Sequence, residues 1–276
     1  MTTIDSLSLP GRRIVYIGRI FFAAGLVGIG IQHFIFSAFI PVMIPWWPIH
    51  ILPGTLWAYI VGALLTAGGV CTLYEKYAKQ SLIILAFFFL LSFILLHIPH
   101  NLLTNQFEIG SWTSAFKDFA FAGCAFVIAG TLATAKNPST TDSLLSRITY
   151  LLVPIAKYPL AIMMVVFGTD HFIYVSFVAS LVPNWIPWHL FWTYFAGFAL
   201  IAGGIGIIFN IKPRLAANLL GIMLLIWLII LHIPRAIADP AGNFGNEWTS
   251  VFEALAYSGI LFILGQSKSK HKKSFS

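Results

Sequence analysis

Charged residues are scarce in this chain. Only 9% of its 276 residues are Asp, Glu, Lys or Arg, whereas a soluble globular domain carries about 25%. Hydrophobic residues make up 59% of the sequence, and no charged residue occurs between Arg19 and Glu75. A backbone in so long an apolar stretch must satisfy its own hydrogen bonds, which in a bilayer means forming helices. The composition therefore excludes a soluble globular protein and predicts an all-α integral membrane protein.

Several sequence signals of chemistry are missing as well. The only two cysteines, Cys71 and Cys124, lie in apolar segments, where we interpret them as small packing residues and not as a redox pair. There is no G-x-S-x-G, H-E-x-x-H or P-loop motif. The first apolar run follows Gly11-Arg12-Arg13, is too long for a signal peptide and lacks a small-residue cleavage site, so we expect it to be a membrane span. No residue pattern predicts a catalytic nucleophile.

Eight apolar segments have about the 20 residues that a bilayer-spanning helix requires. The polar stretch AKNPSTTDSLLSR (135–147) separates four of them from the other four. We therefore expect a first unit over 1–134, a cytoplasmic linker over 135–148, a second unit over 149–266 and a basic tail over 267–276. The predicted spans are 14–38, 54–74, 80–98, 112–134, 149–177, 189–210, 213–233 and 247–266.

The two halves repeat each other in sequence, with five matches in the same order and at similar spacing. Because each half holds four spans, both copies should cross the membrane in the same direction, related by a pseudo-twofold axis along the membrane normal. This predicts two parallel four-helix repeats. The matches are GIGIQHF (28–34) with VFGTDHF (166–172), WWPIH (46–50) with WIPWH (185–189), WAYIVGALLTAGG (57–69) with WTYFAGFALIAGG (192–204), LLHIPH (95–100) with ILHIPR (230–235), and SWTSAFKDFAFAG (111–123) with EWTSVFEALAYSG (247–259).

Lysine and arginine are distributed very unequally between the two sides of the predicted bundle. Only Lys117 and Arg235 fall on one side, and cytoplasmic loops are the ones enriched in these residues. We therefore expect a bacterial inner-membrane protein with both termini in the cytoplasm. The net charge of +7 is explained by topology and by contact of the tail with anionic lipid, and not by nucleic-acid binding. The cytoplasmic side carries Arg12, Arg13, Arg19, Lys76, Lys79, Lys136, Arg147, Lys157, Lys212, Arg214, Lys268, Lys270, Lys272 and Lys273.

Histidines recur at matched positions near the outer ends of the spans. His33 and His171 lie in the outer halves of the first and fifth spans, and His97 and His232 end the third and seventh. One interpretation is an interfacial belt of amphipathic side chains. The other is a polar cavity in each half, lined by His33 and His97 in one and by His171 and His232 in the other. The prolines of the two H-I-P elements, Pro99 and Pro234, should end those helices just after the histidine.

Differences between the matched halves predict polar pairs. Gln32 corresponds to Asp170, and His100 corresponds to Arg235. Because a lone buried carboxylate is costly, we expect Asp170 to pair with Arg235. Gln32 and His100 would form the uncharged equivalent in the first half.

Lys117 and Glu253 occupy matched positions too, each five residues after Trp112 or Trp248. Equivalent residues meet only at a pseudo-twofold axis, so this pair would tie the two halves together. The alternative is that each residue reaches the interface or pairs locally, with Asp118 as a competing partner for Lys117.

The histidines do not predict a metal site. His97 and His100 have ligand spacing, but Pro99 lies between them and the second copy has Arg235, which cannot ligate a metal. A quinone-type ligand suits the composition better, because it needs an apolar groove, aromatic walls and one or two hydrogen-bond donors. The candidate ligand-binding residues are His33, His97 and Trp112 in the first half, and Asp170, His171, His232, Arg235 and Trp248 in the second.

The four-span unit resembles the DoxX-like family of small bacterial membrane proteins. The resemblance depends on His-Phe near the end of the first span, the small-residue elements TAGG (66–69) and IAGG (201–204), and the H-I-P and W-T-S elements. It covers almost the whole chain as two tandem copies, whereas the family usually has one unit. The resemblance implies an inner-membrane protein. Some members of the family are subunits linked to the quinone-dependent oxidation of sulfur compounds, and others are partners in redox or stress complexes.

These observations together predict a polytopic inner-membrane protein that acts as a quinone-associated redox component, with a membrane or periplasmic protein as its partner. The first alternative is a structural or scaffolding protein whose histidines face lipid headgroups. The second is a small-molecule transporter, which the few polar residues in the inner halves of the spans disfavour.

Overall fold

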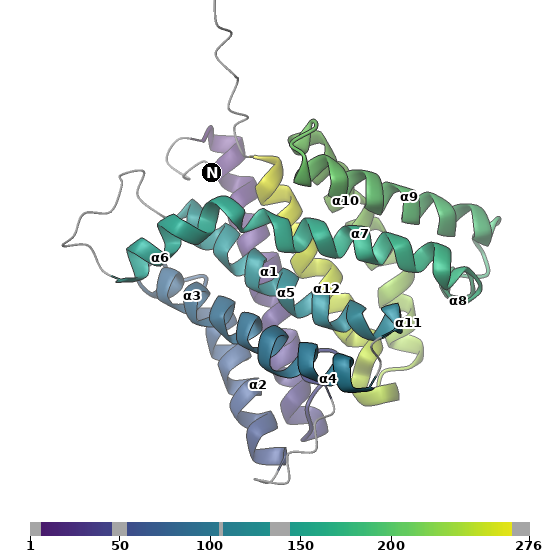
Figure 1. Cartoon of the computed structure of the whole chain (residues 1–276), viewed down its shortest axis with the longest axis horizontal. Coiled ribbons are helices and arrows are strands. Elements are labelled where there is room, and N and C mark those ends of the chain that lie inside the picture. Colours follow the sequence, from purple (N-terminus) through teal and green to yellow (C-terminus); the bar gives the residue numbers. More distant parts are fainter. Residues whose placement is uncertain (1–6, 46–53, 105–106, 133–143, 267–276) are drawn as a thin grey trace, which may run out of the picture.

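The computed structural model describes residues 7–45, 54–104, 107–132 and 144–266. These residues form helices and no strands (Figure 1). Eight helical stretches are long and apolar enough to cross a membrane, as expected for a multi-pass membrane protein. The first W-x-P-x-H element (46–50), most of the predicted linker (135–143) and the basic tail (267–276) lie outside the described residues.

Within the described residues, six helical segments precede the predicted linker, and nine follow, the first of which begins inside that linker. The first six are α1 (Leu9–Phe36), α2 (Gly54–Cys71), α3 (Glu75–Ser92), η2 (Phe93–His97), α4 (Ile98–Thr104) and α5 (Ile109–Thr131). The remaining segments are α6 (Leu144–Leu152), η3 (Val153–Ile155), α7 (Lys157–Ile173), α8 (Val175–Leu181), α9 (His189–Ile208), α10 (Pro213–Trp227), η4 (Leu228–His232), α11 (Ile233–Ala238) and α12 (Gly242–Gly265).

Each H-I-P element follows a π-helical turn that ends at its histidine, η2 in one case and η4 in the other. The expectation that Pro99 and Pro234 end these helices is wrong, because α4 continues to Thr104 and α11 to Ala238. A proline inside an α-helix lacks one N–H donor and collides with the carbonyl four residues earlier. In the wider π turn before the proline, backbone hydrogen bonds span five residues instead of four. The helix can therefore continue past the proline.

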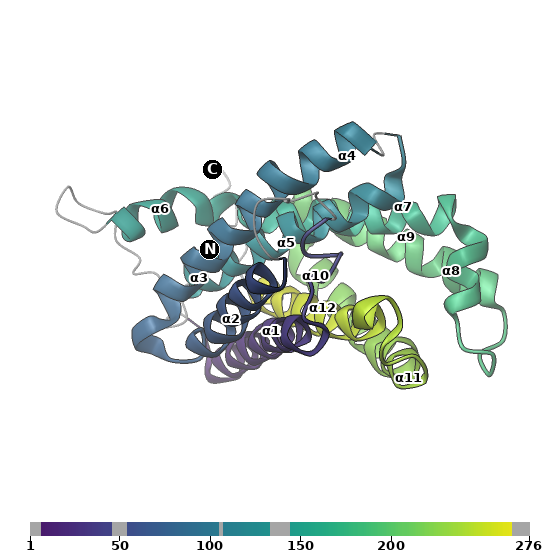
Figure 2. The same ribbon diagram turned by 90° about the horizontal axis from the view of Figure 1, so that it is seen from below.

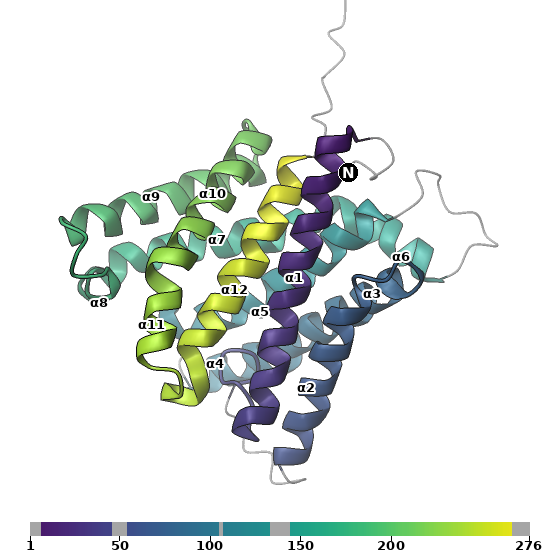
Figure 3. The ribbon, with the colours of Figure 1, turned by 180° about the vertical axis from the view of Figure 1, so that it is seen from behind.

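Two helices form the centre of the bundle. In the most apolar windows of α5 and α12, 83% and 72% of residues are buried, against half or fewer in the other six spans. α1 packs antiparallel along α12, and α7 packs along α5 (Figures 2 and 3). Each central helix therefore packs against the first long span of the other half of the chain.

Glycines allow the closest of these approaches. A Cβ atom added at Gly18 of α1 would lie 2.5 Å from the backbone oxygen of Gly259 in α12, and one added at Gly259 would lie 2.7 Å from the oxygen of Gly18. Small residues let membrane helices pack backbone against backbone, where dispersion contacts replace the missing hydrophobic drive. Aromatic rings of Phe22, Phe121 and Tyr257 then join α1, α5 and α12 in one core.

We predict that Gly18→Ala lowers the stability of the bundle by about 1–3 kcal/mol, because the added methyl group meets backbone that cannot move aside. Thermal unfolding of the purified protein in detergent measures the change. Gly54→Ala is the matched control, since nothing lies within 4 Å of a Cβ atom at the start of α2. Equal melting temperatures for the two variants would contradict the prediction.

Candidate functional site

A cavity of about 350 Å³ lies among the helices of the second half of the chain. Residues of α7, α8, α9 and α10 form most of its wall, and η4, α11 and the starts of α5 and α12 contribute to the rest. Aromatic and aliphatic side chains predominate, among them Phe167, Phe177, Trp192 and Trp227. The volume and the apolar wall are typical of a small-molecule site. Five candidate polar groups converge on it: Asp170, His171, His232, Arg235 and Glu247.

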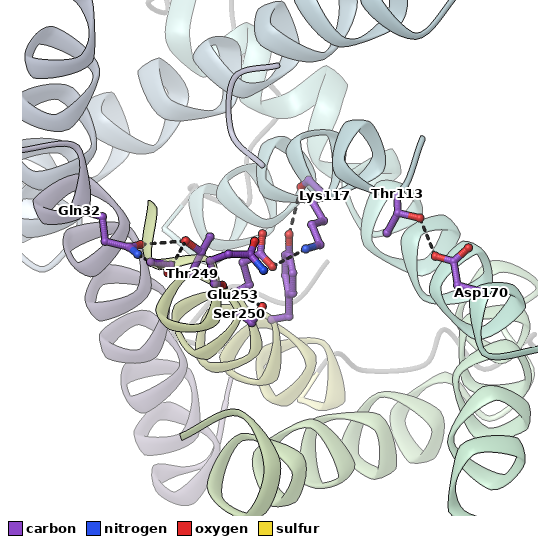
Figure 4. Close-up of polar contacts among 10 residues, drawn as sticks. Gln32, Thr113, Lys117, Asp170, Thr249, Ser250 and Glu253 are labelled. Carbon is purple, nitrogen blue, oxygen red and sulfur yellow. Dashed lines mark hydrogen bonds and ion pairs between the residues drawn. The ribbon is translucent and has the colours of Figure 1, made fainter. Parts of the chain in front are cut away.

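Asp170 reaches the cavity from α7 and is held by the first half of the chain. Thr113 of α5 donates a hydrogen bond of 2.6 Å to its Oδ2 (Figure 4). Oδ1 is buried and has no hydrogen-bond partner among the described residues. One oxygen of this carboxylate is therefore unused by the protein itself.

The predicted ion pair between Asp170 and Arg235 is wrong, although both residues line the cavity. Arg235 of α11 instead binds Glu247 of α12, with Nε 2.9 Å from Oε2 and Nη2 2.5 Å from Oε1. The planar guanidinium matches both carboxylate oxygens at once, which makes this partner more favourable. The sequence carried a signal for it, because Glu247 replaces Ser111 in the matched W-T-S elements just as Arg235 replaces His100.

The two matched histidines of α1 and α7 have the same local geometry. His171 Nδ1 lies 2.7 Å from the carbonyl oxygen of Phe167, and His33 Nδ1 lies 2.8 Å from that of Ile29. A carbonyl only accepts hydrogen bonds, so Nδ1 carries the proton in both rings. The Nε2 atom of each ring then presents a lone pair. Only His171 lines the cavity, whereas His33 Nε2 is buried with no hydrogen-bond partner among the described residues.

His97 occupies a different environment from its match His232. His232 lines the cavity, whereas His97 is buried with Nε2 3.2 Å from the carbonyl oxygen of Met43 and 3.4 Å from Oδ2 of Asp118. Met43 is itself only 1% exposed, and Ser92 also donates a hydrogen bond to its carbonyl oxygen. The Nε2 atom of His97 therefore already has partners within the protein.

The remaining sequence candidates lie outside the cavity. Gln32 does not form the predicted pair with His100, because its amide donates to the carbonyl oxygen of Gly245 at 2.8 Å and accepts from Thr249 at 3.1 Å. Those partners belong to α12, so they are reached across the contact between the two halves of the chain (Figure 4). Trp112 and Trp248 are half-buried on α5 and α12 and are not part of the cavity wall.

Lys117 and Glu253 meet between α5 and α12, with Nζ 2.8 Å from Oε2 (Figure 4). The side chains are 12% and 5% exposed, so this is a buried ion pair. The hydroxyl group of Tyr257 donates to the carbonyl oxygen of Lys117, and the ammonium group lies 5.5 Å from the ring of Phe167 in the cavity wall. The competing partner Asp118 pairs with His97 instead.

The cavity is suited to a small organic ligand. Across residues 7–45, 54–104, 107–132 and 144–266, no three His, Cys, Asp or Glu side chains come together in a way that could hold a metal ion. Trp192, in the cavity wall, has a buried Nε1–H group with no hydrogen-bond partner among the described residues.

We predict that Lys117→Met and Glu253→Gln each destabilise the protein by about 3–5 kcal/mol, because either change leaves one charge or polar group buried alone. The double variant Lys117→Met/Glu253→Gln should recover much of the loss. Thermal unfolding in detergent, compared as a double-mutant cycle, measures the coupling. Additive losses in the double variant would show that the two side chains do not depend on each other.

No protein-family model, curated protein or solved structure matches the chain.

Proposed function

We propose that this chain is a multi-pass membrane protein that binds a quinone-type ring in the cavity of its second half, as a component of a redox system. The cavity of about 350 Å³ is the observation that carries the proposal. The aromatic side chains of its wall suit a flat ring, and the aliphatic side chains of its wall suit a hydrocarbon tail. The free N–H of Trp192 and the guanidinium of Arg235 supply donors for the ring oxygens.

We further propose that the chain is a tandem repeat of a DoxX-like four-helix unit. Matched positions make matched contacts, which supports this proposal. Thr113 donates to Asp170, and its match Thr249 donates to Gln32, the match of Asp170. Close glycine contacts agree as well: Gly30 with Gly62 in α1 and α2, and Gly168 with Gly197 in α7 and α9.

We propose a bacterial inner membrane as the location, with both termini in the cytoplasm. The arginines and lysines near the starts of α1, α3 and α10 support this orientation, by the bias of positive charge toward the cytoplasm. The cavity residues Asp170 and Arg235 then lie toward the periplasmic side, where a membrane or periplasmic protein partner would exchange electrons with the bound ring.

We predict that Ala196→Leu weakens binding of a short-tailed benzoquinone about 10- to 100-fold, because the added side chain occupies the cavity. Titration of the detergent-solubilised protein measures the affinity, and thermal unfolding checks that the variant folds. Ala238→Leu, at an exposed position outside the cavity wall, is the control. If neither the wild type nor the control binds quinone, the ligand-binding proposal fails and a scaffolding role is favoured.

The proposed orientation predicts that a reporter that works only in the cytoplasm is active when it is fused to the N-terminus or to the C-terminus. A reporter that works only in the periplasm should be active when inserted between α11 and α12, near Asp239. The reverse pattern would contradict the positive-inside assignment.

A further inference from the structure

The hydrogen-bonding groups of the cavity distinguish the two redox forms of a quinone-type ring. A quinone carries two carbonyl oxygens and can only accept hydrogen bonds, whereas the corresponding hydroquinone carries two hydroxyl groups and can both donate and accept. Free donors in the cavity therefore serve either form. Free acceptors serve only the hydroquinone.

Asp170, which lines the cavity, has a buried acceptor oxygen with no hydrogen-bond partner among the described residues. Asp170 Oδ2 is bonded to Thr113, but Oδ1 is buried without a partner. Arg235, the cation that the sequence predicted as the partner of Asp170, is held by Glu247. A buried carboxylate oxygen without a donor is costly, so a ligand that brings an O–H group gains more here than one that brings a carbonyl.

His171 adds a second acceptor beside the first. Its Nδ1–H is used by the carbonyl oxygen of Phe167 at 2.7 Å, so Nε2 of the neutral imidazole presents a lone pair. His232 also lines the cavity and has no side-chain hydrogen bond among the described residues, so it can serve in either role. The Trp192 and Arg235 donors remain available to the lone pairs of the same ligand oxygens.

We propose that the cavity binds the hydroquinone form in preference to the quinone, with Asp170 Oδ1 and His171 Nε2 accepting hydrogen bonds from the ligand hydroxyl groups. This inference rests on the proposed function of the same cavity. It assigns Asp170 as the residue that determines specificity for the redox state of the ring.

The test compares the affinities of one short-tailed benzoquinone and its hydroquinone for the full-length protein in detergent under anaerobic conditions. The ratio of the two affinities is measured for the wild type, Asp170→Asn and Asp239→Asn. Asp170→Asn keeps an acceptor for Thr113 but can turn an N–H₂ donor toward the cavity. Asp239→Asn makes the same chemical change at an exposed residue, which accepts a hydrogen bond from the Gly242 N–H and is not part of the cavity wall. Because all three proteins are measured with the same two ligands in one detergent, the partitioning of the ligands into micelles cancels when their ratios are compared.

We expect the wild type and Asp239→Asn to bind the hydroquinone about 10- to 100-fold more tightly than the quinone, as for a hydrogen bond to a charged group. Asp170→Asn should lose this preference. Equal affinities in the wild type, or tighter binding of the quinone because a protonated Asp170 donates to it, would overturn this inference and leave the proposed function standing. A preference that persists in Asp170→Asn would overturn the assignment of Asp170. Failure of the wild type to bind either form would overturn the proposed function itself.

Discussion

A polar group inside an apolar bundle is stable only if it meets a partner, and in this protein several partners come from opposite halves of the chain. Lys117 of α5 meets Glu253 of α12, Thr113 meets Asp170, and Gln32 meets Thr249 and Gly245. Separating the halves would leave each of these groups unpaired in an apolar environment. The two halves of the chain are therefore interlocked, because the first long span of each half packs on the central helix of the other.

The two halves use the same framework differently. Ile40 and Met43, which follow the GIGIQHF element, are buried in the first half, whereas Val178 and Leu181, which follow the VFGTDHF element, line the cavity in the second. The imidazole of His97 is hydrogen-bonded to the carbonyl oxygen of Met43, whereas His232 lies on the cavity wall. The first half is packed interior at these positions, and the second half has space for a ligand. This difference explains why histidines at matched sequence positions lead to a single proposed binding site.

The π turns η2 and η4 reconcile a proline with a continuous helix. Bonds over five residues widen the turn just before Pro99 and Pro234, so α4 and α11 extend the third and seventh spans. The extension of α11 brings Arg235 opposite the start of α12, where it meets Glu247. The cavity wall therefore contains a paired arginine, and Asp170 forms no ion pair within the described part of the chain.

Composition and charge alone determined that this chain is helical and has eight apolar spans, because length and hydropathy are local properties of the sequence. The matched positions also pointed to the pair of Lys117 and Glu253. They did not predict that Arg235 chooses Glu247 over Asp170, that Gln32 binds Thr249, or that α4 and α11 continue past their prolines. These outcomes depend on which helices become neighbours and on how a turn relaxes around a missing N–H. Only the tertiary structure decided them, because pairing in an apolar interior is set by distances across the bundle and not by spacing along the chain.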